Sequence, residues 1–287
     1  MLVREKVPAK VNLTLDVLGI EGNYHNIKSL VASINVYDTV TLIKRADKRI
    51  TLKVIGFPIK CPVQENNAVK AAVAFMKKFQ TRGVSIIINK KIPVAGGLGG
   101  SSADVVAVLK GMKKLFDVDA DVMPIANELG SDCGYMMNGG YAVISGRGTE
   151  VERKFVEKSI PLILVSSPEN VTAKNCYGTY DKLGKVYPAC TDEAEKLLVK
   201  GDIKGLAGIM KNDLEEASFT LAPNAKFPKE VLEFVGAEKV LVSGSGPTVY
   251  GVFATQSARD AAFRKISPLF GERAIKANTI ADQPINK

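Results

Sequence analysis

Hydrophobic and polar residues alternate over several short stretches in the N-terminal third of the chain, which is the two-residue period of a half-buried β-strand. The alternation predicts a strand at residues 11–17, and further strands are expected at 39–43, 50–55 and 84–89. Between the last two, residues 65–80 place apolar side chains such as Val69, Ala72 and Phe75 at helical spacing, which predicts a helix. This part of the chain therefore mixes strands and helices.

A glycine-rich segment follows the strand predicted at 84–89. Residues 94–102 read V-A-G-G-L-G-G-S-S, and residues 103–116 then have the pattern of an amphipathic helix. Glycine lets a backbone approach oxygen atoms closely, and the free N–H groups at a helix start attract an anion. The segment is neither a Walker A motif nor a G-x-G-x-x-G motif. The order of strand, glycine-rich loop and helix predicts a phosphate site, with a plain glycine turn as the alternative.

The rest of the chain continues the mixture of helices and strands. We expect helices at 122–129, 174–183, 191–200, 203–212 and 257–265, and strands at 141–144, 162–166, 239–242 and 249–253. Residues 146–158 are polar and charged, which is typical of a domain boundary. With 287 residues, the chain is predicted to be an α+β protein of two domains, residues 1–155 and 156–287.

Composition excludes several classes of function. The single histidine, His25, excludes zinc sites built from several histidines, and the four cysteines form no C-x-x-C pair. No apolar run approaches the roughly 20 residues that span a bilayer, so we expect a cytoplasmic protein without a membrane partner. The net charge is +9, but the basic residues are scattered. They favour a solvated surface or a small polyanionic substrate over a nucleic acid.

Three segments, in order along the chain, resemble the motifs of the GHMP family of small-molecule kinases. They are P-A-K-V-N-L at 8–13, the segment at 93–103 with G-L-G-G-S-S-A, and V-S-G-S-G-P-T at 242–248. The resemblance implies a two-domain GHMP kinase fold with the active site in the cleft between domains. It also implies ATP and Mg²⁺ as cofactors and phosphoryl transfer to a small alcohol.

The resemblance also assigns roles to individual residues. It implies that Asp132 accepts or orients the proton of the attacking hydroxyl and that Lys10 lies near the γ-phosphate. It implies that Ser102 contacts Mg²⁺. The residues implied to bind ATP are Asn66, Lys90, Gly97, Leu98, Gly99, Gly100, Ser101 and Ser102. Without the resemblance, Asp132 has the pattern of a turn aspartate, Lys10 of a surface lysine and Asn66 of a helix cap.

Within the family, the chain is most similar to kinases of isoprenoid precursor synthesis whose substrate carries a cytidine diphosphate group. The similar segments are G-N-Y-H at 22–25, G-S-D at 130–132 and V-T-A-K-N-C-Y at 171–177. The similarity implies that Tyr24, His25 and Tyr177 hold the cytosine ring and that Asn12 lies near the reacting hydroxyl.

The chain also departs from the pattern of these kinases. Asn23 is inserted, Ala173 stands where threonine is usual, and Cys133-Gly134 follows Asp132. The alternatives are a sibling kinase for another small alcohol, such as mevalonate or homoserine, and a non-catalytic descendant that binds nucleotide. The sequence does not indicate an oligomeric state.

Overall fold

The computed structural model describes residues 1–22, 24–59 and 61–282, so the inserted Asn23 lies outside the described residues. The chain forms two compact units, each made of several segments. Unit 1 consists of Met1–Ala9, Val36–Val94 and Gly99–Asn138, and unit 2 of Lys10–Asn35, Ala95–Leu98 and Gly139–Lys287. The division into residues 1–155 and 156–287 stays a prediction, because the compact units follow a discontinuous division of the chain.

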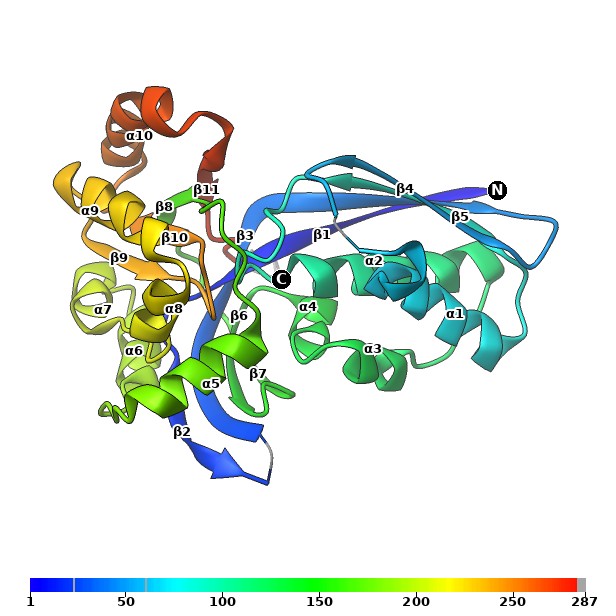
Figure 1. Ribbon diagram of the computed structural model, residues 1–287, viewed down its shortest axis with the longest axis horizontal. Coiled ribbons are helices and arrows are strands. Elements are labelled where there is room, and N and C mark those ends of the chain that lie inside the picture. The colour runs from blue at the N-terminus through cyan, green and yellow to red at the C-terminus, as the bar shows by residue number, and fades with distance from the viewer. Residues whose placement is uncertain (23, 60, 283–287) are drawn as a thin grey trace, which may run out of the picture. The chain divides into compact units, whose positions relative to one another are not determined.

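Unit 1 contains a mixed group of strands covered by helices. Strand β4 pairs in parallel with β5, which pairs antiparallel with the last residues of β3. The helices lie along one face of these strands (Figure 1), and α2 packs closely on β3, since a Cβ at Gly111 would lie 2.6 Å from Leu42 Cδ1. The elements with residues in unit 1 are β1 (Leu2–Asn12), β3 (Tyr24–Lys44), β4 (Ile50–Gly56), α1 (Asn67–Phe79), β5 (Val84–Lys90), α2 (Gly100–Phe116), α3 (Met123–Leu129) and α4 (Cys133–Asn138).

Unit 2 contains two groups of antiparallel strands. Strands β2 and β6 pair with the first part of β3, and β7 pairs with β6. The second group is a four-stranded sheet in the order β11-β8-β10-β9, against which α9 and α10 pack (Figure 1). The strands are β2 (Asp16–Glu21), β6 (Tyr141–Gly146), β7 (Glu150–Lys154), β8 (Pro161–Val165), β9 (Lys239–Val242), β10 (Val249–Val252) and β11 (Ala274–Asn278). The helices are α5 (Ala173–Leu183), α6 (Thr191–Val199), α7 (Ile203–Ile209), α8 (Glu215–Leu221), α9 (Lys226–Phe234) and α10 (Gln256–Phe270).

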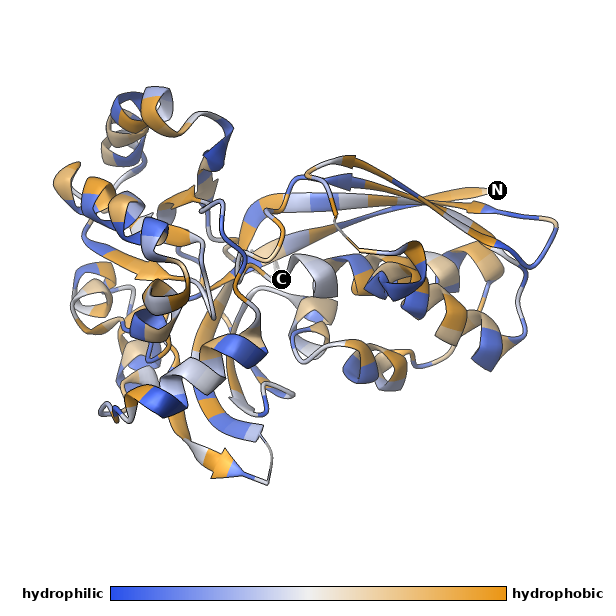
Figure 2. Ribbon diagram, in the orientation of Figure 1, coloured by the Kyte–Doolittle hydropathy of each residue, from blue (hydrophilic) through white to orange (hydrophobic). Residues whose placement is uncertain are grey.

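The α+β class is confirmed, and most predicted elements are present with ends shifted by a few residues. Burial alternates along β5, where Val84, Ile86 and Ile88 are buried. Figure 2 shows both hydrophobic and hydrophilic residues along β4 and β5. The strand predicted at 11–17 is wrong, because β1 ends at Asn12 and β2 begins at Asp16. The polar residues there do not form an exposed face. The Thr14 hydroxyl lies 2.7 Å from that of Thr191, and Asp16 accepts the Thr191 N–H, so these polar groups are buried in pairs.

Several elements escaped the sequence analysis. Residues 146–158, predicted as a boundary, contain β7, whose charged residues suit a strand paired on one side only. Helix α8 was missed because it has only seven residues. Helix α9 was missed because Pro228 interrupts the hydrophobic pattern, although Pro228 stands in the first turn, where no N–H is needed. Helix α4, strand β11 and the first part of β3 were also missed. Among the described helices, none combines the length and apolarity needed to cross a membrane.

Candidate functional site

The first and third sequence motifs meet in unit 2 around Lys10. Its ammonium group donates a hydrogen bond to Asn12 Oδ1 at 2.6 Å, and its backbone N–H donates to the Leu98 carbonyl at 3.0 Å. A Cβ on Gly244 would lie 3.2 Å from Asn12 Oδ1 and 3.3 Å from Lys10 Nζ, so the third motif passes directly against both side chains. Lys10 is 5% exposed, and the interpretation as an ordinary surface lysine is therefore wrong.

The glycine-rich loop also lies against the third motif in unit 2. Gly97 has a φ of +73°, and a Cβ there would lie 1.8 Å from the Ser243 carbonyl oxygen. The Ser243 hydroxyl donates to the Gly97 carbonyl at 3.0 Å. The neighbouring Leu98 side chain is buried, so only its backbone is available to a ligand. This close approach of two backbones is the physical reason for glycine at 97.

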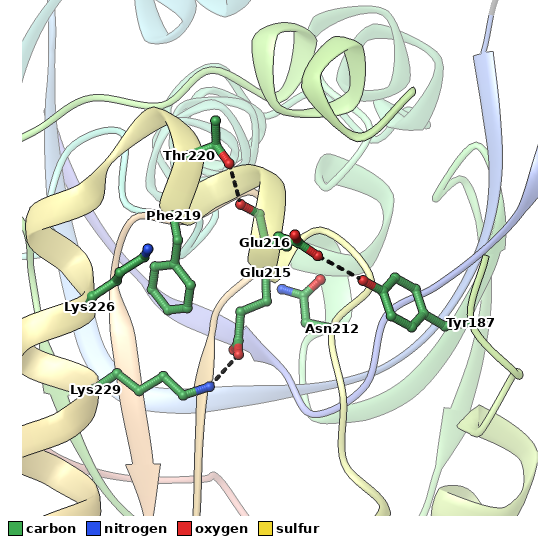
Figure 3. A pocket seen from close by; sticks show the side chains of 8 residues that line it. All are labelled: Tyr187, Asn212, Glu215, Glu216, Phe219, Thr220, Lys226 and Lys229. Carbon is green, nitrogen blue, oxygen red and sulfur yellow. Dashed lines mark hydrogen bonds and ion pairs between the residues drawn. The ribbon is translucent and has the colours of Figure 1, made fainter. Parts of the chain in front are cut away.

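Asn212, which lies outside the three motifs, holds the third motif in place. Its side-chain amide donates to the carbonyl oxygens of Val242 and Gly244 at 2.9 and 2.7 Å. Beside it, α8 and α9 line a pocket of about 510 Å³ (Figure 3). The pocket is lined by Tyr187, Asn212, Glu215, Glu216, Phe219, Thr220, Lys226 and Lys229, none of which is a predicted site residue. Both glutamates are paired, Glu215 with Lys229 and Glu216 with Tyr187 (Figure 3). Glu215 also accepts the backbone N–H of Val242 at 3.1 Å, so the pocket wall contacts the first residue of the third motif.

The second half of the glycine-rich loop begins α2 in unit 1. Gly99 precedes the helix with a φ of 72°, and Gly100, Ser101 and Ser102 form its first turn. Within the described residues, no side chain caps this start, so the first N–H groups of the helix are available to an anion. A Cβ at Gly130 would lie 3.0 Å from Ser102 Oγ. Unit 1 therefore places Ser102 beside the turn that carries Asp132.

Lys90 is buried beneath this loop and does not present a cation to solvent. It is 3% exposed, and its ammonium group donates to Asp38 at 2.5 Å, to Asp104 at 2.6 Å and to the Gly100 carbonyl at 3.1 Å. Burial lowers the pKa of Lys90, but the two carboxylates outweigh burial and raise it. Burial also raises the pKa of Asp104 to about 7. All three protons of the ammonium group are donated within the protein. A contact of Lys90 with ATP stays a prediction.

Asn66 caps helix α1, as its sequence pattern without the family resemblance predicts. Its side-chain oxygen accepts the Ala68 N–H at 2.9 Å. The next residue, Asn67, donates to the Ser101 hydroxyl at 3.0 Å and so links α1 to the glycine-rich loop. A contact of Asn66 with adenine stays a prediction.

Two of the three residues predicted to hold cytosine lie together in unit 2. The rings of His25 and Tyr177 stack with centroids 4.5 Å apart, and His25 Nε2 lies 2.7 Å from a carboxylate oxygen of Asp181. Tyr177 and Asp181 are four residues apart on α5 and share one helix face. Tyr24 has a different neighbour, because the Arg147 guanidinium carbon lies 3.4 Å from its ring centroid.

Sequence reasoning missed Asp38, Asp104, Asp181 and Asn212. Asp38 and Asp104 are single charges within apolar stretches, a pattern that indicates a buried ion pair and could have identified them. Asp181 has the helical spacing to Tyr177 as its only signal. Asn212 begins the segment N-D-L-E at 212–215, which also resembles the kinases with a cytidine diphosphate substrate, but that segment does not show its partners, which lie elsewhere in the chain.

Comparison with known proteins gives the family. The model of the GHMP kinases N terminal domain matches residues 66–147, and that of the GHMP kinases C terminal domain matches residues 194–271. The curated 4-diphosphocytidyl-2-C-methyl-D-erythritol kinase of Bacillus mycoides is 36% identical over 253 residues, which cover 86% of each chain.

Solved structures agree with this similarity. A crystal structure of 4-(cytidine 5'-diphospho)-2C-methyl-D-erythritol kinase has a TM-score of 0.82 and 25% identity, and the match covers 98% of this chain and 100% of the other. The mevalonate kinase of L. major has a TM-score of 0.76 at 15% identity, covers 98% and 96% of the two chains, and shows likeness of fold alone. Since both domain models match in order and a curated member is 36% identical over most of the chain, this protein belongs to the GHMP kinase family.

Proposed function

We propose that the protein transfers the γ-phosphoryl group of ATP to the 2-hydroxyl of 4-diphosphocytidyl-2-C-methyl-D-erythritol, a step in the non-mevalonate synthesis of isoprenoid precursors. The observation that carries this proposal is the 36% identity to a kinase of that name over 86% of the chain. The grouping of Lys10 and Asn12 with the glycines of the other two motifs supports it, because phosphoryl transfer depends on positioned charges and dipoles.

The nucleotide phosphates are proposed to bind at the start of α2. The uncapped N–H groups there, together with the helix dipole, favour a polyanion, and glycines 97, 99 and 100 allow close approach of oxygen atoms. Leu98 and Ser101 contribute backbone groups of the same loop.

Mg²⁺ is proposed to be held by the Ser102 hydroxyl and the ATP phosphates. Among the described residues, no cluster of three or more acidic, histidine or cysteine side chains could hold a metal ion. Mg²⁺ beside nucleotide phosphates commonly takes most of its ligands from phosphate and water. When bound, the ion supplies neutralisation of phosphate charge.

Asp132 is proposed to accept the proton of the attacking hydroxyl. It lies on the turn beside Ser102, so the proton acceptor and the phosphate loop are held by the same unit. Lys10 is proposed to stabilise charge on the transferred phosphoryl group, and Asn12, which orients the Lys10 ammonium, to contact the substrate near its hydroxyl. A group that accepts a proton in the transition state contributes about 10²–10⁴-fold in rate.

The cytosine ring is proposed to bind at His25 and Tyr177, with Tyr24 as the third aromatic side chain. Stacking on aromatic side chains is a common means of holding a nucleobase. Because the two rings now stack directly on each other, a base that enters between them must separate them. Asp181 would keep its hydrogen bond to His25 as this happens.

A coupled assay of ADP release tests the proposal. We expect turnover with the cytidine-linked substrate and little with mevalonate or homoserine, and a loss of about 10²–10⁴-fold in kcat for Asp132→Asn with an unchanged unfolding midpoint. Undiminished turnover in Asp132→Asn would refute the mechanism. Equal activity without the cytidine group would point to a sibling kinase, and ATP binding without turnover to a non-catalytic descendant.

A further inference from the structure

A buried cluster of three charged side chains lies beneath the glycine-rich loop in unit 1. Asp38 comes from β3, Lys90 from β5 and Asp104 from α2. Their exposed fractions are 1%, 3% and 4%. Three different elements therefore bring these charges to one place inside the unit.

The cluster uses every proton of its one ammonium group. Lys90 Nζ donates to Asp38 Oδ2, Asp104 Oδ2 and the Gly100 carbonyl, at 2.5, 2.6 and 3.1 Å. The other oxygen of Asp38 accepts the backbone N–H groups of Lys91 and Ile92 at 2.7 and 2.9 Å. Asp38 thus fixes the chain where it leaves β5.

These contacts hold the loop at both ends. Lys91 and Ile92 precede the loop, Gly100 lies in its second half and Asp104 follows it, while Lys90 connects the two sides. The sides are packed closely, because a Cβ on Gly100 would lie 3.0 Å from Ile92 Cγ2 and 3.1 Å from Lys90 Nζ. A shift of the ammonium group would therefore move the start of α2 relative to β5.

A buried cluster of charges is weak evidence of a stabilising role. Two carboxylates surround one ammonium group, and among the described residues Asp104 Oδ1 is buried without a hydrogen-bond partner. Buried charges are costly to desolvate, and apolar residues of similar volume often replace such clusters without loss of stability. Directional hydrogen bonds, in contrast, specify geometry at the base of the loop.

We propose that Asp38, Lys90 and Asp104 are positioning residues that set the geometry of the phosphate-binding loop for the nucleotide. The inference rests on the proposed function in one respect, that the loop binds the phosphates of ATP. None of the three side chains needs to touch the nucleotide, since the cluster acts through the backbone at residues 91, 92 and 100.

The test replaces Lys90 and Asp104 by apolar residues, leaves Asp38 with its backbone partners, and measures nucleotide binding directly. In Lys90→Met/Asp104→Leu we expect Mg-ADP to bind about tenfold or more weakly in isothermal titration calorimetry, since tenfold corresponds to about 1.4 kcal/mol, the size of one misplaced hydrogen bond to phosphate. We also expect KM for ATP to rise while KM for the cytidine-linked substrate changes little. The conservative variant Asp104→Asn keeps an acceptor oxygen and should lose less affinity than Asp104→Leu.

The matched control is Phe75→Leu, which alters a fully buried side chain of unit 1 on α1 and should lower the urea midpoint without changing Mg-ADP affinity. If the double variant does not fold, Asp38→Asn is measured in its place. A folded cluster variant with wild-type affinity for Mg-ADP overturns the inference. Wild-type protein that binds Mg-ADP without turning over the cytidine-linked substrate refutes the proposed function alone, and the binding comparison still decides this inference.

Discussion

Replacement of Gly97 by alanine tests whether the glycine-rich loop and the third motif must touch for activity. The added Cβ would start 1.8 Å from the Ser243 carbonyl oxygen, whereas ordinary contact begins at 3.4 Å. The two backbones must therefore separate by about 1.6 Å or rotate by a comparable amount. The hydrogen bond from the Ser243 hydroxyl to the Gly97 carbonyl would be lost in the process.

The structure sets the size of the expected effect of Gly97→Ala. A left-handed φ at a residue with a Cβ costs roughly 1–2 kcal/mol, and the lost hydrogen bond adds about 0.5–1.5 kcal/mol. A displacement of about 1 Å near reacting groups can cost about 10²-fold in rate. We expect a fall of at least this size in kcat/KM, together with destabilisation of about 2–3 kcal/mol.

Steady-state kinetics and urea unfolding of the purified variant measure these two quantities. Gly184→Ala is the matched control, because Gly184 has a φ of +61° with nothing within 4 Å of an added Cβ. It should lose about 1 kcal/mol from backbone strain alone and keep full activity. If Gly97→Ala keeps kcat/KM within about twofold of wild type and unfolds like Gly184→Ala, the reasoning about the close approach is wrong.

Three further outcomes are expected. Asn212→Ala should lower kcat/KM, measured in the coupled assay, because the third motif loses two hydrogen bonds. An unchanged kcat/KM would show that the third motif keeps its conformation without Asn212. Native protein should react with one equivalent of a thiol reagent, at exposed Cys61, and denatured protein with four equivalents. Burial raises the pKa of the other thiols to about 11 at Cys133, about 12 at Cys176 and about 11 at Cys190, so these thiols react slowly in the native protein. Burial opposes ionisation of Asp16, but hydrogen bonds from Lys211 and Thr191 lower the pKa of this carboxyl below its ordinary value of 3.8. The stabilisation of the fold by the Asp16 carboxylate is therefore present above pH 3.8 and is lost as the pH falls below it. The urea midpoints of Asp16→Asn and wild type should differ at pH 7 and converge in acid.

The elements that the sequence predicted well are those defined by neighbouring residues. The helix at 65–80 appears as α1, capped by Asn66, because periodic burial and a helix cap both depend on residues a few positions apart. The glycine-rich loop was equally readable, since positive φ and close approach require glycine itself. The strand predicted at 11–17 failed, because alternation cannot show that a polar side chain such as Thr14 has a partner elsewhere.

The sequence by itself determined the secondary-structure class, the glycine-rich phosphate motif and the resemblance to the GHMP kinases. Only the tertiary structure decided which charges are buried and what they hold. Lys90 meets Asp38 and Asp104 across 52 and 14 residues, and His25 meets Asp181 across 156. Burial of a charge depends on partners that strand pairing and helix packing bring together. The family resemblance implied that Lys90 binds ATP, and only the fold showed that its ammonium group is buried under the glycine-rich loop.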